Sequence, residues 1–248
     1  MDLKNRVALV TGASSGIGQA VAISLAKEGV RVAVTARRKE RLQELLETIA
    51  GAGGRAFAHP ADLRKPEEIQ ALFAAMDSEF GQLDILINNA GLARWGSMQT
   101  GDPEGWREMF DVNVLALCIA TQEALRRFPP EGGHIVNISS MAGHRVPPNT
   151  GLYSATKHAA TAITEITRQE LRQQESPTRV TQISPGFVAT EFFIASTGSV
   201  EESDRILRSA VEKPLQPDDI AASVLHALQA PPHVSIHDIL VRPTSQRS

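Results

Sequence analysis

The sequence predicts an α/β fold in which a doubly wound parallel sheet of seven strands is flanked by helices. Short apolar runs alternate with longer stretches whose apolar residues recur every three or four positions, as buried strands and amphipathic helices require. This alternation continues along almost the whole chain. Strands that alternate with helices of this length form parallel sheets that carry helices on both faces.

Seven short apolar runs are the expected strands. In chain order they are Arg6–Val10, Val30–Thr35, Arg55–His59, Asp84–Ile87, His134–Ile138, Arg179–Ile183 and Ile236–Val241. Each is too short for a helix and is separated from the next by at least one amphipathic stretch or by turn residues. Buried parallel strands are expected to read as nearly continuous apolar runs, as these do.

The helices between these strands follow from apolar spacing and from helix start and stop signals. Ile17, Val21 and Leu25 lie on one face of the first helix, which Gly29 ends. The second carries Leu42, Leu45, Leu46 and Ile49, and Gly51 ends it. Later helices are expected at Pro66–Phe80, Pro103–Phe128, Tyr153–Gln173 and Asp218–Leu228.

One segment lacks strand signals. Residues 187–216 are interpreted as an insertion with one or two helices that forms a substrate lid. The chain shows no internal repeat, low-complexity segment or linker, so residues 1–248 are expected to form a single domain.

Composition excludes several classes of protein. The formal net charge is −3, which lacks the basic excess of a nucleic-acid-binding protein. The one cysteine, Cys118, excludes an internal disulfide and a cysteine-rich zinc site, and no metal site is expected. The apolar run Val114–Ala120 is too short to span a membrane, and the N-terminus does not resemble a signal peptide. A cytoplasmic protein is therefore expected.

A glycine-rich turn follows the first strand. It reads Thr11-Gly12-Ala-Ser14-Ser15-Gly16-Ile17-Gly18 and opens the first helix. Glycines at such spacing permit a tight turn, a close approach of a pyrophosphate and close packing of helix on sheet. The helix N-terminus offers free N–H groups to phosphates. The turn therefore predicts a dinucleotide site.

The end of the second strand indicates which dinucleotide. An NAD site would place an acidic residue here, whereas this sequence has Ala36 followed by Arg37 and Arg38. Guanidinium groups bind a 2′-phosphate through two parallel hydrogen bonds. The alternative is a solvated basic helix start, but cations oppose the dipole there. The pattern favours NADP(H).

A tyrosine and a lysine share one helix face further along the chain. Tyr153 and Lys157 are four residues apart, and Ser140 follows the fifth strand. An ammonium near a phenol favours the phenolate, so we expect a Tyr153 pKa below the usual value of about 10. Such a phenol is a usable general acid and base near neutral pH.

Taken together, these motifs resemble the short-chain dehydrogenase/reductase family over essentially the whole chain. The glycine-rich turn, Asn88-Asn-Ala-Gly91, Ser140, Tyr153-x3-Lys157 and Pro185-Gly186 occur in the family's order. The resemblance implies a single-domain Rossmann-type fold and an NADP(H)-dependent enzyme acting on carbonyls or alcohols. It also implies that Tyr153 exchanges the proton, Ser140 binds the substrate oxygen, Lys157 holds the ribose and Asn113 anchors a relay water. The expected cofactor contacts are Gly12, Ser14, Ser15, Gly16, Ile17, Gly18, Arg37, Arg38, Asp62, Leu63, Asn89, Ala90, Gly91, Tyr153, Lys157, Pro185, Gly186, Val188 and Thr190.

A finer resemblance concerns the substrate. The stretches 88–94, 111–117, 140–146 and 242–244 are similar to the member-eleven group of animal dehydrogenase/reductases and to insect farnesol dehydrogenases. These groups act on ketosteroids, aldehydes and prenyl alcohols with NADP(H). Bacterial 3-hydroxy-acid dehydrogenases share the Arg-Pro ending.

The expected substrate pocket is mostly apolar. Its candidates are Arg94, Trp95, Met141, His144, Phe187 and Phe192. The aromatic members suit a hydrophobic ketone or aldehyde. Three polar residues are the exceptions: Arg94, His144 and Arg145. They would either bind the carboxylate of a small 3-hydroxy acid or form ion pairs at the surface.

Two further alternatives concern function itself. A non-catalytic NADP(H)-sensing protein would be expected to lack Tyr153, and a nucleotide-sugar epimerase would be longer. As partners we expect a small-molecule carbonyl or alcohol and further copies of this chain, in a homodimer or homotetramer. The expected interface consists of apolar residues that lie beyond one narrow stripe on the two long helices, such as Ile119, Ala159, Ile163 and Ile166.

Overall fold

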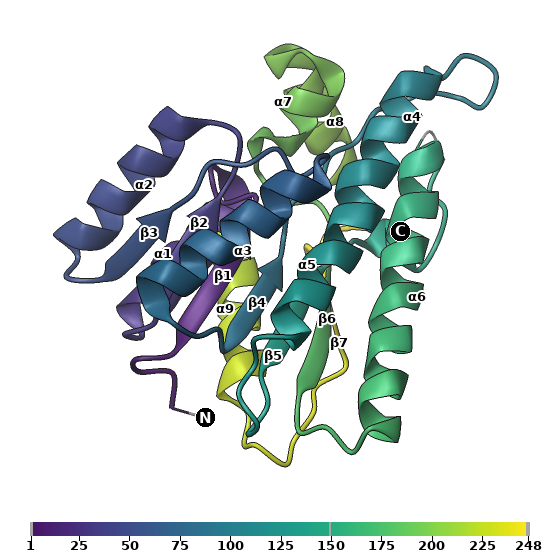
Figure 1. Cartoon of the computed structure of the whole chain (residues 1–248). Helices are drawn as coiled ribbons and strands as arrows, with labels where there is room; N and C mark the ends of the chain where they lie inside the picture. The colour runs from purple at the N-terminus through teal and green to yellow at the C-terminus, as the bar shows by residue number, and fades with distance from the viewer. Residues whose placement is uncertain (1, 149, 247–248) are drawn as a thin grey trace.

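The computed structural model describes residues 2–148 and 150–246 and contains the expected seven-stranded parallel sheet (Figure 1). The rest of the expected domain, residues 1, 149 and 247–248, lies outside the described part. The strands are β1 (Val7–Thr11), β2 (Arg31–Thr35), β3 (Arg55–Ala58), β4 (Ile85–Asn88), β5 (His134–Ile138), β6 (Arg179–Pro185) and β7 (Asp238–Val241). Their order is β3-β2-β1-β4-β5-β6-β7, and every pairing is parallel.

Helices cover both faces of the sheet (Figure 1). One face packs against α1 (Gly16–Lys27), α2 (Lys39–Gly51) and α9 (Pro217–Gln229). The other packs against α3 (Pro66–Phe80), α5 (Ala116–Leu125) and α6 (Leu152–Gln173). Because both faces are covered, the central strands are buried along their length, which explains their unbroken apolar runs.

The order of the strands places a binding site. The order reverses between β1 and β4: after β1 the chain adds β2 and β3 on one side, and after β4 it adds β5, β6 and β7 on the other. In open parallel sheets, ligands bind at such a reversal, outside the carboxyl ends of the strands. At this edge β1 ends at Thr11, β4 at Asn88 and β5 at Ile138, so the three predicted site motifs begin side by side.

The predicted helix Pro103–Phe128 is wrong as a single regular helix. The structure contains α4 (Pro103–Phe110), a π-helical turn at Asp111–Leu115, and α5, which ends at Leu125. The wider turn inserts one extra residue per turn, which the apolar spacing does not reveal. The π-helical turn contains Asn113, whose side chain is turned inward and is only 2% exposed.

The expected lid segment contains two helices, α7 (Glu191–Thr197) and α8 (Val200–Ala210). Both stand above the carboxyl ends of the strands (Figure 1). Val188 and Leu215 pair in a short parallel bridge, which brings the two ends of the segment together. Within residues 2–148 and 150–246, no helix combines the length and the apolar character that a membrane crossing requires.

Candidate active site

The glycine-rich turn forms a cradle between β1 and α1. A Cβ on Gly12 would lie 2.8 Å from Ala90 Cα, and one on Gly18 would lie 2.5 Å from the Gly12 carbonyl oxygen. Gly12 and Gly16 also adopt positive φ, which other residues rarely do. Helix α1 has no side-chain cap and no acidic residue in its first turn. The turn therefore leaves donors available to an anion, and its residues fit the phosphates of a dinucleotide.

Asn89 and Thr11 hold this turn in place. The Asn89 amide donates to the carbonyls of Thr11 and Gly12 at 2.9 and 3.1 Å. The Thr11 hydroxyl accepts from the N–H groups of Asn89 and Ala90, both at 3.0 Å. Asn89 thus stabilises the glycine-rich turn, called the phosphate turn below, by hydrogen bonds to its backbone carbonyls. The sequence alone does not reveal this role of Thr11, because the contacts of its hydroxyl depend on the folded geometry.

The two predicted arginines have different surroundings. Arg38 lies over the glycine-rich turn and donates to the Ser14 hydroxyl at 2.9 Å and to the Ser15 hydroxyl at 2.7 Å. Arg37 lies 3.9 Å from the Glu108 carboxylate and is more exposed. The structure therefore brings Arg38, Ser14 and Ser15 together, with Arg37 to one side.

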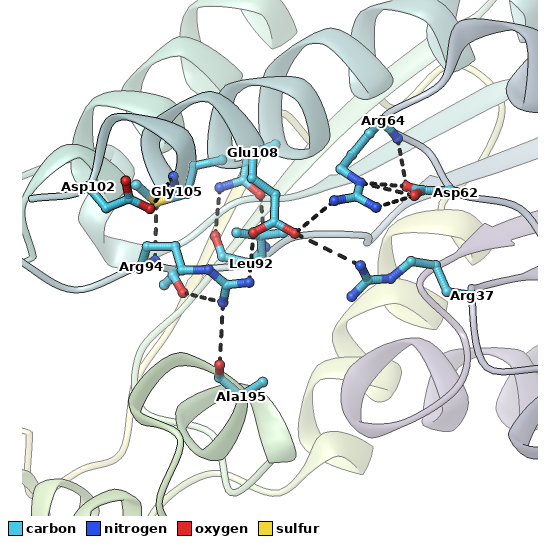
Figure 2. A network of polar contacts seen from close by, with 12 residues as sticks. Arg37, Asp62, Arg64, Leu92, Arg94, Asp102, Gly105, Glu108 and Ala195 are labelled. Carbon is cyan, nitrogen blue, oxygen red and sulfur yellow. Dashed lines mark hydrogen bonds and ion pairs between the residues drawn. The ribbon is translucent and has the colours of Figure 1, made fainter.

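Asp62 and Glu108 extend this charged region toward the substrate side (Figure 2). The Asp62 carboxylate accepts from Arg64 at 3.0 Å, and this hydrogen bond lowers its pKa. Glu108, largely buried, lies 3.5 Å from Arg64, 3.9 Å from Arg37 and 2.6 Å from Arg94. The sequence alone does not reveal the roles of Arg64 and Glu108, because neither lies in a local motif.

Of the other expected cofactor residues, Thr190 lies against the same turn. Thr190 packs against Gly16, since a Cβ there would lie 3.0 Å from the Thr190 methyl carbon. Val188 and Leu63 are buried, and the Gly186 N–H donates to the Val241 carbonyl at 2.7 Å. The fold therefore brings Thr190 to the glycine-rich turn from a distant part of the chain.

Tyr153, Ser140 and Lys157 also converge at this edge. The Tyr153 phenol is hydrogen-bonded to Ser140, and both Tyr153 and Lys157 are buried. The Lys157 Nζ donates to the Ile138 carbonyl at 3.0 Å and lies 5.8 Å from the centre of the Tyr153 ring. The three side chains come from one helix and the end of the neighbouring strand, as predicted.

Burial reverses one expectation about Tyr153. It raises the phenol pKa to about 12, although the Ser140 hydrogen bond lowers it in part. Burial also lowers the pKa of Lys157 to about 8, because a buried ammonium loses its hydration. The expected phenol pKa below 10 is therefore wrong, because the desolvation of Tyr153 outweighs the effect of its Ser140 hydrogen bond.

Asn113 is fixed in the π-helical turn. Its side-chain amide accepts from the Leu92 N–H and donates to the Leu92 carbonyl, both at 2.9 Å, and donates to the Thr156 hydroxyl at 3.0 Å. A Cβ on Gly91 would lie 3.5 Å from both the Asn113 Oδ1 and the Lys157 Nζ. Asn113 and Lys157 thus flank the same short backbone stretch, and a Cβ at Gly91 would be in ordinary van der Waals contact with both.

Aromatic rings close the substrate side. Trp95 and Phe192 lie 5.4 and 5.7 Å from the Tyr153 ring centre. Phe193 stacks on Phe187 at 5.8 Å and on Trp95 at 6.3 Å. The Trp95 indole donates to the Ser196 hydroxyl at 2.7 Å. Helix α7 therefore seals Tyr153 from solvent with apolar surface. Met141 is buried in the turn that follows Ser140.

The two polar substrate candidates are engaged with the protein. Arg94 donates to Glu108 at 2.6 Å and to the Ala195 carbonyl at 3.4 Å (Figure 2). The His144 Nε2 is hydrogen-bonded to the Ser184 hydroxyl at 2.8 Å. The structure therefore does not bring Arg94 and His144 together with Tyr153 as free polar groups.

Two other features lie outside this site. A cavity of about 360 Å³ lies at the far end of α6, lined by Arg168, Arg172 and His237 among others, and does not reach Tyr153. Among the described residues, no three or more His, Cys, Asp and Glu side chains gather closely enough to hold a metal ion.

Known proteins with similar sequences or structures agree with this geometry. The model of the short chain dehydrogenase family matches residues 6–199. Dehydrogenase/reductase SDR family member 11 of Bos taurus is 46% identical over 98% of both chains. Farnesol dehydrogenase of Aedes aegypti is 39% identical over 98% of this chain and 97% of its own.

Solved structures of similar fold bind either dinucleotide. An alcohol dehydrogenase of Thermococcus sibiricus, complexed with 5-hydroxy-NADP, matches with a TM-score of 0.86 and 30% identity over 99% of both chains. A short-chain dehydrogenase/reductase of Burkholderia phymatum, in complex with NAD, matches with a TM-score of 0.88 and 28% identity over 97% of this chain and 90% of its own. With its sheet order, glycine-rich turn and Ser140–Tyr153–Lys157 cluster, the chain belongs to the short-chain dehydrogenase/reductase family.

Proposed function

We propose that this protein is an NADP(H)-dependent oxidoreductase that transfers a hydride between the nicotinamide and a carbonyl or secondary alcohol. The observation that carries this proposal is the Tyr153 phenol, hydrogen-bonded to Ser140 inside an apolar enclosure at the edge of the sheet. A proton donor paired with a second hydroxyl is what a carbonyl oxygen needs as it becomes an alkoxide.

Each side chain has a distinct role in the proposed reaction. In the reductive direction a bound reduced nicotinamide would supply the hydride that the carbonyl carbon accepts. Tyr153 gives its proton to the oxygen, which Ser140 holds by a hydrogen bond. Lys157 binds the ribose and, once charged, favours the phenolate that Tyr153 becomes. Asn113 fixes the backbone at Leu92 and anchors a relay water that returns a proton to Tyr153.

The surroundings of Arg38 support a preference for NADP(H). Its guanidinium lies on the two serines of the phosphate turn, and position 36 is an alanine rather than an acidic residue. A 2′-phosphate placed there would accept hydrogen bonds from a guanidinium and two hydroxyls. The NAD ribose would find no carboxylate at position 36.

The aromatic enclosure supports a hydrophobic ketone or aldehyde as substrate. Trp95, Phe187, Phe192 and Phe193 surround the approach to Tyr153, and the charge of Arg94 is balanced by Glu108. The similar protein named farnesol dehydrogenase is named for a prenyl alcohol, which is a substrate of this apolar kind.

A small 3-hydroxy acid is the second candidate. The buried Arg145 Nε has no hydrogen-bond partner among the described residues. Arg145 follows the turn after Ser140, so it is a possible partner for a substrate carboxylate.

The experiment that tests the proposal is a substrate panel read by the absorbance of the reduced nicotinamide. Hydrophobic ketones, aldehydes, prenyl alcohols and 3-hydroxy acids are each offered with NADP(H) and with NAD(H). We expect turnover with apolar carbonyls or alcohols and NADP(H). Higher kcat/KM for 3-hydroxy acids would favour the second candidate, and equal use of both cofactors would contradict the NADP(H) preference.

A further inference from the structure

Helix α7 connects the phosphate turn to the proton donor. Its first residue, Glu191, lies beside Arg38, and the next residue, Phe192, packs on the Tyr153 ring at 5.7 Å. Two neighbouring residues of one helix therefore contact the two ends of the site.

The Glu191 carboxylate occupies hydrogen-bond donors of the phosphate turn. It accepts from the Arg38 guanidinium at 2.8 Å and from the Ser15 hydroxyl, and it lies 3.9 Å from Arg41. These contacts lower the pKa of Glu191, with the Arg38 hydrogen bond as the largest cause, so the carboxylate is charged at neutral pH. Arg38 in turn holds Ser14 and Ser15.

A cofactor phosphate requires the same donors. The first turn of α1 has no acidic residue and no side-chain cap, so Glu191 brings a negative charge to this turn from outside it. A carboxylate and a phosphate dianion on one guanidinium would repel each other. The anion with more charge and more acceptor atoms is expected to displace the other.

We propose that Glu191 is a specificity-determining residue, a lid carboxylate that competes with the cofactor 2′-phosphate for Arg38 and Ser15. This role rests on the proposed preference for NADP(H). A cofactor that carries the 2′-phosphate displaces Glu191, whereas NAD(H), which lacks this group, leaves the Arg38–Glu191 pair in place.

Displacement of Glu191 also moves Phe192. The middle and the end of α7 are held separately, by Arg94 on the Ala195 carbonyl and by Trp95 on the Ser196 hydroxyl. Glu191 is the ionic contact at the beginning of the helix. Its release therefore frees the end of α7 that carries Phe192, and the Tyr153 phenol becomes accessible to substrate.

Two nucleotides that differ only in the 2′-phosphate test this role. Adenosine 2′,5′-bisphosphate carries the group and 5′-AMP lacks it, and neither has a nicotinamide to reach Tyr153. Affinity is measured by calorimetry for the wild type, for Glu191→Gln and for Glu202→Gln. Glu202 is a matched control, because it lies on the second lid helix and, within residues 2–148 and 150–246, forms an ion pair only with the exposed Arg205. Trp95 fluorescence, recorded in a Trp106→Phe background, reports the position of α7.

We expect Glu191→Gln to bind the bisphosphate about two- to fivefold more tightly than the wild type, because a half-exposed ion pair opposes binding only modestly. The affinity for 5′-AMP changes less, and Glu202→Gln behaves as the wild type. The bisphosphate, but not 5′-AMP, changes Trp95 fluorescence in the wild type.

The outcomes separate this role from the proposed function. Equal binding of the two nucleotides by the wild type would overturn the preference for NADP(H) and the role of Glu191 with it. The wild type could bind the bisphosphate more tightly than 5′-AMP while Glu191→Gln shows no gain, or a loss, in affinity for the bisphosphate. This result would overturn the role of Glu191 alone. A gain in affinity with silent Trp95 fluorescence would overturn the movement of α7.

Discussion

Arg37 and Arg38 are adjacent in sequence, yet their side chains lie in different networks. Arg38 contacts Ser14, Ser15 and Glu191, whereas the ion-pair partner of Arg37 in the described part of the chain is Glu108, at 3.9 Å. The sequence predicts a basic pair at the end of β2 and cannot rank its members. The ranking depends on contacts with residues outside the local motif, from Ser15, 23 positions before Arg38, to Glu191, 153 positions after it.

We predict that Arg38→Gln weakens the binding of NADP⁺ more than Arg37→Gln does. Loss of a charged hydrogen bond to a phosphate costs about 1.5–3 kcal/mol, which corresponds to about a ten- to hundredfold increase in Kd. Binding of NAD⁺, measured in the same calorimetric series, is expected to change little in either variant. Equal losses in the two variants would mean that the ligand-free contacts do not indicate the phosphate position.

Burial also sets the protonation of residues away from the site. His134 is 1% exposed at the start of β5, and its Nε2 is hydrogen-bonded to the Thr181 hydroxyl at 2.8 Å. Burial, with a smaller effect of the Arg179 charge, lowers the His134 pKa to about 3. Between pH 6.5 and 3 the unfolded chain therefore binds a proton here that the folded protein does not.

It follows that His134 makes the protein less stable as the pH falls. The contribution of neutral His134 to the free energy of unfolding is fully present above pH 6.5. Below pH 6.5 it decreases by about 1.4 kcal/mol per pH unit, so about 2 kcal/mol is lost at pH 5. The free energy of unfolding, measured by urea at pH 7.5 and 5, should fall less in His134→Asn than in the wild type. His233→Asn, at an exposed position, is the control. An unchanged slope in His134→Asn would exclude this cause.

At the scale of secondary structure, the packing of helix α7 on Tyr153 affects the pKa of the phenol. The spacing of Tyr153 and Lys157 predicts one shared helix face, and the structure confirms it. The spacing does not predict that a ring from a lid helix covers Tyr153. For the same reason the expected direction of the phenol pKa was wrong, since a sequence does not reveal which distant element covers a residue.

We predict that Phe192→Ala lowers the pKa of Tyr153 from about 12 toward about 10, because water then reaches the phenol. Tyr153 is the only tyrosine of the chain, so ultraviolet absorbance follows its titration alone. Phe110→Ala, which removes an exposed ring at the end of α4, serves as the control. A pKa in Phe192→Ala equal to that of the wild type would show that α7 does not cause the shift.

At the scale of the whole molecule, the sheet was the most predictable feature. All seven strands were expected within a few residues of their observed positions, because buried parallel strands and amphipathic helices have different apolar spacing. The three site motifs follow β1, β4 and β5, so their convergence also follows from the parallel sheet. The charged contacts of Glu108 and Glu191 could not be predicted, since they join segments with no local pattern.

We predict that the protein sediments as a homodimer or homotetramer. Phe110, Leu115 and Ile166 are large apolar residues that are 41%, 46% and 54% exposed on neighbouring segments around α4 and α6. Such a group is expected to be covered by another copy. Ile166→Glu should reduce the sedimentation coefficient toward that of a monomer, whereas Val200→Glu, at a similarly exposed residue of α8, should not. A wild-type monomer at micromolar concentration would contradict this expectation.

The most direct test of the proposed function compares turnover and cofactor binding in Tyr153→Phe. This change removes one hydroxyl and keeps the ring that packs on Trp95 and Phe192. If Tyr153 is the proton donor, kcat for NADPH-dependent carbonyl reduction should fall by at least about a hundredfold, and the Kd for NADPH should stay within a factor of about two. Reduction at an undiminished rate by Tyr153→Phe would contradict the account.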